Sequence, residues 1–201
     1  AESELQLRTA RKVLEKTGLT EEEVRYLFAG DLLAQGIATS YGIMELQIPL
    51  FGLYGACSTC GESLSLAAMC ISAGYAGCVM ALTSSHFASA EKEFRFPLDY
   101  GSQRPLSASW TVTGSGACVL GKTKSRVKIT GATTGKIIDY GLKDNQNMGA
   151  CMAPAACDTI AQNLVDFNRE PADYDRIVTG DLGVVGREIL LELLKKKGYD
   201  I

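Results

Sequence analysis

Long hydrophobic runs and runs of one charge are both missing from this sequence. No apolar stretch approaches the roughly 18 residues that a membrane-spanning helix needs, and no secretory signal pattern is present. Acidic and basic residues nearly balance, which leaves a net charge of −3. The basic run Lys195-Lys196-Lys197 ends a predicted helix, where the helix dipole favours cations. We therefore expect neither a membrane span nor a nucleic-acid partner.

A disulfide framework is absent as well. The number of cysteines is odd, they show no regular spacing, and several lie in apolar surroundings; they occupy positions 57, 60, 70, 78, 118, 151 and 157. We expect reduced thiols and no metal ion. Cys57 and Cys60 have the spacing of a thioredoxin motif, but the surrounding pattern is not that fold, so we interpret the spacing as accidental.

The most informative stretch of the sequence surrounds Cys57. The apolar run from Pro49 to Tyr54 is typical of a buried strand in a parallel sheet, and apolar residues at helical spacing follow from Ser58 to Ala73. The small pair Gly55-Ala56 allows a sharp turn between the two elements. Cys57 is thus predicted at a strand-to-helix junction, where unpaired backbone N–H groups and the helix dipole favour negative charge.

Two interpretations of Cys57 follow from this position. A thiol at the start of a helix can have a pKa well below the usual value of about 8.5, which would make Cys57 a nucleophile or part of an anion site. Free cysteines are also often small buried apolar residues without chemical function. The sequence pattern alone leaves both interpretations open.

An internal repeat relates residues 13–31 to residues 163–181. Both segments contain a helix end, an acidic turn, an apolar triplet and the tripeptide Gly-Asp-Leu, and Asp181 follows Asp31 by 150 positions. A duplicated α/β half-domain explains the pattern. A second copy of the Cys57 junction would fall at about position 207. Because the sequence ends at Ile201 and does not begin with methionine, we expect it to be a piece of a longer chain.

Strands and helices are expected to alternate along the sequence. The predicted strands span residues 24–29, 50–54, 78–83, 110–113, 117–120, 127–130 and 177–179. The predicted helices span residues 3–16, 33–42, 58–73, 152–167 and 185–197. Short βα units of this kind form a mainly parallel sheet with helices on its faces. We predict an α/β fold of two half-domains, residues 1–145 and an incomplete second half at residues 146–201.

Asp31 and Asp181 end predicted strands in equivalent places of the repeat. They could form a carboxylate pair, but we favour helix N-capping, for which aspartate is well suited. Trp110 precedes a predicted strand, so we expect it in the core or at a dimer interface. The glycines at 114, 116 and 121 lack the spacing of a dinucleotide-binding fingerprint.

Several longer stretches of the sequence resemble a known family. They are Phe28-Ala-Gly-Asp-Leu-Leu33, Phe51-Gly-Leu-Tyr-Gly-Ala-Cys-Ser-Thr59, Thr83-Ser-Ser-His-Phe-Ala-Ser-Ala-Glu91, Phe94-Arg-Phe-Pro97, Tyr100-Gly-Ser-Gln-Arg-Pro105, Thr111-Val-Thr-Gly-Ser-Gly116, Met148-Gly-Ala-Cys-Met-Ala-Pro-Ala155 and Tyr174-Asp-Arg-Ile-Val-Thr-Gly-Asp-Leu182. Together with the duplicated half-domain, they are similar to the thiolase-like superfamily and, within it, to the stage V sporulation protein AD family. The resemblance covers almost the whole chain, although that family usually has serine at the position of Cys60.

The resemblance implies a thiolase-like fold and a ligand-binding role. Proteins of that family would bind dipicolinic acid, pyridine-2,6-dicarboxylate, during its uptake into the developing spore, together with other stage V sporulation membrane proteins. It implies a homodimer paired through a sheet edge. It also implies a location in the spore or forespore, soluble or peripheral at the inner membrane. No cofactor is implied beyond the ligand, bound alone or as its calcium chelate.

A flat dicarboxylate calls for arginine, further N–H or O–H donors and an apolar or aromatic slot. The segment from Ser84 to Arg104 supplies these groups, and we expect it to form a loop on the sheet. The candidate ligand-binding residues are Cys57, His86, Arg95, Tyr100 and Arg104. We hypothesise that His86 and Arg95 face Cys57 across a pocket and hold the ligand's carboxylates at the helix N-terminus.

Each of these assignments has a structural alternative. His86 could cap a helix, Arg95 could form a salt bridge with Glu91 or Glu93, and Arg104 before proline could simply belong to a turn.

Two other functions compete with ligand binding. A condensing, acyl-transferring enzyme would use Cys57 as nucleophile, but it also needs an oxyanion hole and a histidine or second cysteine as acid–base catalyst. The single histidine, His86, lies in the first half, so a complete catalytic set is not expected in this sequence. The third possibility is a structural subunit that scaffolds a membrane complex.

Overall fold

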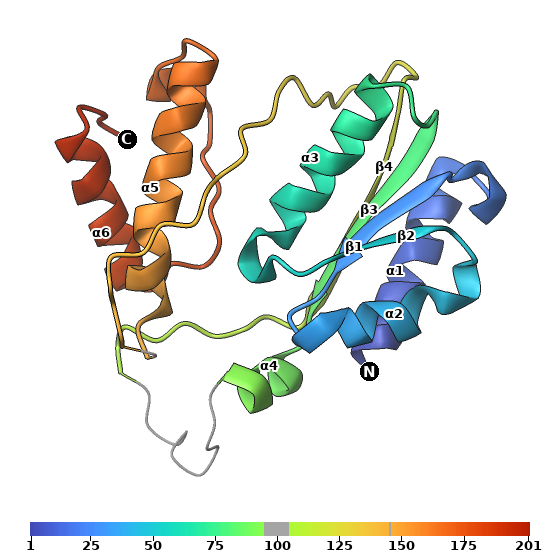
Figure 1. Ribbon diagram of the computed structural model, residues 1–201, viewed down its shortest axis with the longest axis horizontal. Helices are drawn as coiled ribbons and strands as arrows, with labels where there is room; N and C mark the ends of the chain where they lie inside the picture. Colours follow the sequence, from blue (N-terminus) through green and yellow to red (C-terminus); the bar gives the residue numbers. More distant parts are fainter. Residues whose placement is uncertain (95–104, 145) are drawn as a thin grey trace. The chain divides into compact units, whose positions relative to one another are not determined.

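The chain forms two compact units. The computed structural model describes residues 1–94, 105–144 and 146–201. The first unit comprises residues 1–98 and 111–129, and the second comprises residues 99–110 and 130–201. Figure 1 shows a sheet with helices in the first unit and a pair of helices in the second. The predicted α/β fold is confirmed.

The first unit contains a four-stranded sheet in the order β2-β1-β3-β4. Its strands are β1 Tyr26–Gly30, β2 Leu50–Leu53, β3 Cys78–Ser85 and β4 Gly114–Gly121. β1 runs parallel to both β2 and β3, whereas β4 pairs antiparallel with β3. The carboxyl ends of β1, β2 and β3 therefore meet at one edge of the sheet, which we call the carboxyl edge.

Helices cover both faces of this sheet (Figure 1). Helix α1 Glu2–Thr17 and helix α2 Ile37–Ile43 lie on one face, and helix α3 Thr59–Ser72 lies on the other. Helix α4 Phe87–Phe94 follows β3. The predicted helices 3–16, 33–42 and 58–73 are confirmed within a few residues at each end.

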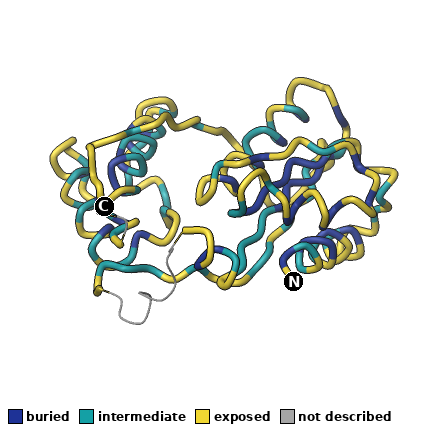
Figure 2. The backbone as a smooth tube through the Cα atoms, turned by 60° about the horizontal axis from the view of Figure 1, so that its bottom comes forward, coloured by how far each residue is buried: buried dark blue, intermediate teal, exposed yellow. Residues whose placement is uncertain are grey.

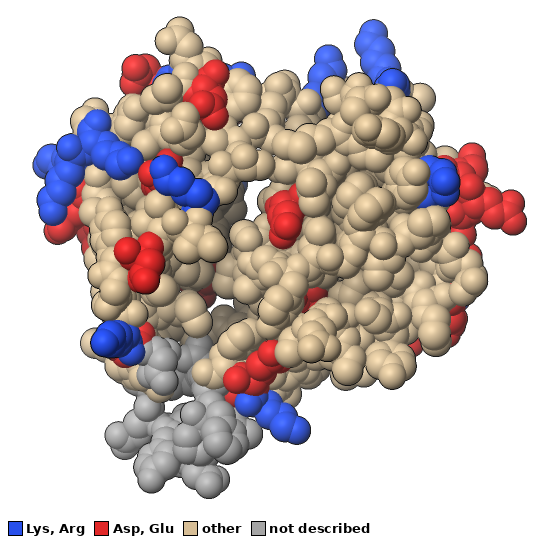
Figure 3. Space-filling view, viewed as in Figure 1, with Lys and Arg blue, Asp and Glu red and all other residues tan. Residues whose placement is uncertain are grey.

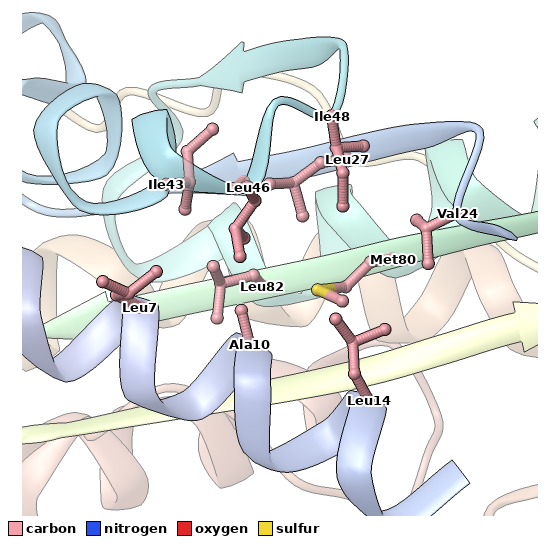
Figure 4. Close-up of a cluster of buried hydrophobic side chains, with 11 residues drawn as sticks. Leu7, Ala10, Leu14, Val24, Leu27, Ile43, Leu46, Ile48, Met80 and Leu82 are labelled. Atoms are coloured by element: carbon pink, nitrogen blue, oxygen red, sulfur yellow. The ribbon is translucent and has the colours of Figure 1, made fainter. Parts of the chain in front are cut away.

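Side chains of the strands alternate between two hydrophobic cores. Met80 and Leu82 of β3 face α1, where Leu7, Ala10 and Leu14 of that helix meet them (Figure 4). The intervening residues of β3, Val79 and Ala81, belong to the core beneath α3. Figure 2 shows the resulting buried centre of the first unit in dark blue. This alternation also determines which face the residues after β3 present.

The second unit packs helix α5 Met148–Asp166 against helix α6 Gly183–Lys196. The two helices approach closely because glycine is present at both contact points: a Cβ at Gly149 would collide with the Leu182 carbonyl, and one at Gly186 would lie 2.6 Å from the Gly149 backbone. The predicted helices 152–167 and 185–197 are confirmed, although α5 begins four residues earlier than predicted.

The predicted repeat is present in the local geometry of the two units. After α1, Gly18 is left-handed, and the 3₁₀ turn Glu21–Glu23 follows; after α5, Asn168 is left-handed and the 3₁₀ turn Pro171–Asp173 follows. All of these positions differ by 150. The hydrogen bonds repeat too: the N–H of Leu19 donates to the Leu14 carbonyl, and that of Arg169 donates to the Leu164 carbonyl.

Three predicted strands are wrong. Residues 110–113, 127–130 and 177–179 take part in no strand pairing. A short β-branched run becomes a strand only where a neighbouring strand accepts and donates its backbone hydrogen bonds. Within the described ranges no such neighbour pairs with these segments, and Val127 and Val178 are exposed.

The loop predicted after β3 is also wrong in part, because residues 87–94 form α4. The sequence contains the signal: Phe87, Ala90, Glu91 and Phe94 have the spacing of one helix face.

Candidate functional site

Three chain segments leave the sheet side by side at the carboxyl edge. Asp31 follows β1, the turn containing Cys57 follows β2, and His86 follows β3. In open α/β sheets, ligands commonly bind beyond the carboxyl ends of parallel strands. The candidate site is therefore built from the residues at this edge.

Cys57 lies in a tight turn between β2 and α3. The 3₁₀ turn Ala56–Ser58 leads directly into the first turn of α3. Ala56 adopts a left-handed conformation with φ of 48°, which is uncommon for a residue with a side chain. The predicted strand-to-helix junction is confirmed. Cys57 is exposed, so its interpretation as a buried apolar residue is wrong.

The start of α3 is held tightly against the ends of β1 and β2. A Cβ at Gly30 would collide with the Leu53 carbonyl oxygen and would lie 2.7 Å from Thr59 Cγ2. The Thr59 hydroxyl accepts a hydrogen bond of 3.2 Å from the N–H of Gly55. The turn that presents Cys57 is thus fixed by the close contact of Gly30 with Leu53 and by the side chain of Thr59.

Asp31 holds α2 at the carboxyl edge. It is buried, and its Oδ2 accepts hydrogen bonds of 2.7 Å from the Thr39 N–H and 2.5 Å from the Thr39 hydroxyl. Its Oδ1 accepts one of 2.8 Å from the Leu33 N–H. Asp31 thus supplies an acceptor to the first turn of α2, although it is not the N-cap residue of this helix, which is Gly36. Asp181 is exposed and accepts a hydrogen bond from the N–H of Gly183. The alternative of a carboxylate pair stays a prediction.

His86 lies just beyond β3 and is half-buried. The strand alternation that turns Met80, Leu82 and Ser84 toward α1 places His86 on the same side. Its Nδ1 atom is buried and has no hydrogen-bond partner among the described residues, so it does not cap α4 through this atom.

His86 and Cys57 occupy different strands of the carboxyl edge. β1 lies between β2 and β3, so the ends of these two strands are about 10 Å apart at normal strand spacing. Cys57 leads into α3 on one face, whereas His86 lies on the α1 side. The hypothesis that they face each other across a pocket stays a prediction, with the end of β1 between them.

Three predicted ligand residues, Arg95, Tyr100 and Arg104, lie outside the described residues. Of the two predicted salt-bridge partners of Arg95, Glu91 is buried within α4 and Glu93 is exposed. Trp110 is also exposed, so the prediction that it lies in the core of this chain is wrong.

A buried polar cluster next to His86 was not predicted. Glu2 and Gln6 of α1 are buried and lie four residues apart on one helix face, where apolar residues are the rule. The hydroxyl of Ser84 donates a hydrogen bond of 2.8 Å to Glu2 Oε1 and accepts one of 2.7 Å from Gln6 Nε2. Polar residues at core positions of an amphipathic helix were the signal in the sequence.

Acidic and basic side chains are interspersed on the face shown in Figure 3. No cluster of three or more His, Cys, Asp or Glu side chains within the described part of the chain has the arrangement of a metal site. None of the helices described here has the length and apolarity to cross a membrane.

The family model described as stage V sporulation protein AD (SpoVAD) matches residues 1–201. The chain is 45% identical over 201 residues to the stage V sporulation protein AD of Bacillus subtilis (strain 168). It spans 60% of the length of that relative.

Solved structures with a similar fold are condensing enzymes. The 3-oxoacyl-(acyl carrier protein) synthase III of Pseudomonas aeruginosa has a TM-score of 0.67 at 15% identity, with 96% of this chain and 65% of that chain covered. The corresponding enzyme of Aquifex aeolicus has a TM-score of 0.70 at 14% identity, with 97% and 66% covered. The tetronic acid condensing enzyme AbyA1 has a TM-score of 0.64 at 18% identity, with 100% and 69% covered. These similarities show a thiolase-like fold.

Proposed function

Since the chain belongs to the stage V sporulation protein AD family, we propose that it is the part of a sporulation protein that binds dipicolinic acid for uptake into the developing spore. The observation that supports this most directly is the exposed turn at Cys57, which opens α3 at the carboxyl edge. The backbone N–H groups of a helix start attract carboxylates. A small planar dicarboxylate is therefore suited to this edge.

The proposed ligand lies over the end of β1, between the turn of Cys57 and the segment that begins at His86. Cys57 and the start of α3 would contact one carboxylate, and His86, Arg95, Tyr100 and Arg104 would contact the other carboxylate and the ring. Arginine suits this role because its planar guanidinium donates two parallel hydrogen bonds to a carboxylate. The ligand is bound alone or as its calcium chelate.

Isothermal titration calorimetry of the full-length protein with dipicolinate tests this proposal. We expect saturable binding, and weaker binding of pyridine-2-carboxylate, which has one carboxylate fewer. Arg95→Ala should weaken binding by about 2 kcal/mol, because a charge-assisted hydrogen bond is lost. The control Arg8→Ala replaces an exposed arginine of α1 and should leave the affinity unchanged. Absence of saturable dipicolinate binding, with and without calcium, would overturn the proposal.

Acyl transfer is the second candidate function. It is favoured by the exposed thiol of Cys57 in a strained turn, on a fold shared with condensing enzymes. Incubation of the full-length protein with acyl-thioesters, followed by intact-mass measurement, should then show an adduct. The adduct should disappear in Cys57→Ser and persist in Cys118→Ser, which replaces another exposed cysteine. No adduct across several acyl chain lengths would argue against this function.

The proposal includes a homodimer and a membrane complex. β2 is one of the two outer strands of the sheet, and the exposed aromatic residues Phe51 and Tyr54 lie along it and just beyond. An apolar edge strand is suited to pairing with a second copy of the same strand. Other stage V sporulation membrane proteins are the proposed partners in the spore or forespore. If the protein is instead a purely structural subunit, the ligand titration described above will show no binding.

A further inference from the structure

A continuous chain of buried and partly buried hydrogen bonds connects two carboxylates beneath the carboxyl edge. We call it the Gln6 network; its members are Glu2, Gln6, Asp31, Thr39 and Ser84. Gln6 Nε2 donates to the Thr39 hydroxyl at 2.9 Å and to the Ser84 hydroxyl at 2.7 Å. The Thr39 hydroxyl donates to Asp31 at 2.5 Å, and the Ser84 hydroxyl donates to Glu2 at 2.8 Å. The network thus joins α1, α2, β3 and the end of β1.

Every hydrogen bond of this network is donated in the direction from Gln6 toward a carboxylate. An amide nitrogen has two hydrogens, and the two shortest contacts of Gln6 Nε2 are those with the hydroxyls, while the Gly30 carbonyl oxygen is a third, longer contact at 3.5 Å. Each hydroxyl then donates its single hydrogen to a carboxylate. Asp31 has two further donors, the N–H groups of Thr39 and Leu33. Among the described residues Glu2 accepts a hydrogen bond from Ser84 alone, so the two ends of the network are unequal.

Three buried polar atoms at the Glu2 end have no hydrogen-bond partner among the described residues: Glu2 Oε2, Gln6 Oε1 and His86 Nδ1. All three belong to the same surroundings, because Glu2 and Gln6 share Ser84 and His86 follows Ser84 on the same side of β3. An ionised carboxylate with one hydrogen bond is poorly compensated for its loss of water. A proton on Glu2 removes that deficit.

The charged groups that face Glu2 come from each neighbouring element. Burial has the largest effect and raises the pKa of Glu2 above its ordinary value of 4.5. The Ser84 hydrogen bond lowers the pKa of Glu2, Asp31 raises it and His86 lowers it, and the net direction is upward. Thr39, the member of the network from α2, is uncharged.

We propose that Glu2 is the proton-binding group of the Gln6 network and that its charge determines how firmly the His86 end of β3 is held against α1. With Glu2 protonated, the carboxyl group is neutral and the buried end of α1 stays docked on Ser84. Ionisation places an undersolvated charge beside Asp31 and favours opening of this end. Glu2 is therefore a positioning residue for His86.

The direction of the pH effect follows from proton linkage. A pKa that is higher in the folded protein than in the unfolded chain means that folding binds the proton more tightly. The stabilisation is complete below the pKa of the unfolded chain and is lost as the pH rises through the folded pKa. We expect the docked arrangement to weaken as the pH rises from 4.5 toward neutrality.

Thermal unfolding of the full-length protein between pH 4.5 and 8 tests the proposal. Glu2→Gln imitates the protonated side chain at every pH. As the pH rises, the melting temperature of the wild type should therefore fall further below that of this variant. A change of about 2 °C is measurable for a domain of this size. The control Glu4→Gln replaces an exposed carboxylate in the same helix turn. The difference between its melting temperature and that of the wild type should not change with pH.

A flat difference for Glu2→Gln, or one that rises with pH, would overturn the proposal. Ser84→Ala provides a second test, because it removes the one hydrogen bond that favours ionised Glu2. This variant should show a steeper fall of melting temperature with pH than wild type. A slope equal to that of wild type would also contradict the role of Glu2.

The consequence for ligand binding rests on the proposed function. Dipicolinate affinity of the wild type should fall as pH rises over the same range, and Glu2→Gln should reduce that fall. The melting curves need no ligand, so the role of Glu2 and the proposed binding of dipicolinate are tested independently. Absence of dipicolinate binding with the expected melting curves would contradict the proposed function alone, and flat melting curves with normal binding would contradict the role of Glu2 alone.

Discussion

Backbone space decides which residues the turn at Cys57 tolerates. Gly30 lies where β1, β2 and α3 converge, and no side chain fits there. Ala56 takes the left-handed conformation in this turn, whereas Gly55 has φ of −101°. A Cβ at Gly55 would lie 2.6 Å from Glu62 Oε2 and 2.7 Å from Ser58 Oγ, which are the ends of flexible side chains that can move away. Sterics and backbone conformation thus act at different residues.

Gly30→Ala should lower the free energy of unfolding by about 2–4 kcal/mol, because the added methyl collides with backbone that cannot move away. Gly52→Ala is the matched control, since a Cβ at that neighbouring strand position meets no atom within 4 Å. Urea unfolding of both variants measures the difference. Equal stability of the two variants would show that β1, β2 and α3 are less tightly packed than described.

Cys57 should be alkylated by iodoacetamide faster at pH 7 than Cys118, because the start of α3 favours the thiolate. Both cysteines are exposed, so access does not distinguish them. Cys157 should react last, because burial raises the pKa of its thiol. Peptide mapping after timed labelling gives the three rates. A pH–rate midpoint near 8.5 for Cys57 would show that the helix start does not perturb this thiol.

The sequence predicted single residues well where their chemistry depends on neighbours in the chain. Cys57 was located from the strand, turn and helix pattern within a few residues. Glu2 and Gln6 were not identified, because their partner Ser84 is 82 and 78 residues away. Contacts at such separations depend on how β3 packs against α1, which no local pattern contains.

Elements show the same contrast between local and distant determinants. The turns after α1 and α5 have the same left-handed residue and the same 3₁₀ geometry, because similar local sequences specify them. The segments that follow differ: residues 26–30 form β1 between two partners, whereas residues 177–179 pair with no strand among those described. The strand predicted at 177–179 is wrong although its local sequence resembles that of β1, because strand formation depends on the surroundings of a segment as well as on its own residues.

The duplicated aspartates allow an element-scale test. Asp31→Ala should destabilise the protein by about 2–4 kcal/mol, since it leaves buried donors of Thr39 and Leu33 without an acceptor. Asp181→Ala removes one exposed hydrogen bond to Gly183 and should cost at most about 1 kcal/mol. Chemical denaturation of the full-length variants measures both values. A larger effect at Asp181 would mean that it has gained buried partners in the longer protein.

At the scale of the whole molecule, the chain represents 60% of the length of its Bacillus subtilis relative. The fold of the first unit was predictable because its cores and strand pairings lie within the sequence. The predicted repeat is visible in the turns after α1 and α5, whereas the strands predicted at residues 127–130 and 177–179 pair with no strand among the described residues.

The outer edge of β2 leads to a prediction about assembly. β2 pairs with β1 on one side, and no described residue pairs with its other side. Phe51 is 50% exposed there although its ring stacks on that of Phe28, with 5.0 Å between the ring centroids. Exposed apolar edge strands promote pairing between chains, and natural proteins often block it with lysine. We therefore expect Phe51→Lys to convert the proposed homodimer of the full-length protein into a monomer.

Light scattering coupled to size-exclusion chromatography measures this change in mass directly. Tyr75→Lys is the control, because Tyr75 is an exposed aromatic residue (76%) in the turn before β3, away from the β2 edge. It should leave the dimer intact. Circular dichroism must show that Phe51→Lys stays folded, since the Phe51 ring also packs against the Tyr26 ring, with 5.5 Å between the ring centroids. A folded Phe51→Lys variant that remains dimeric would place the interface elsewhere, and a monomeric wild type would contradict the homodimer itself.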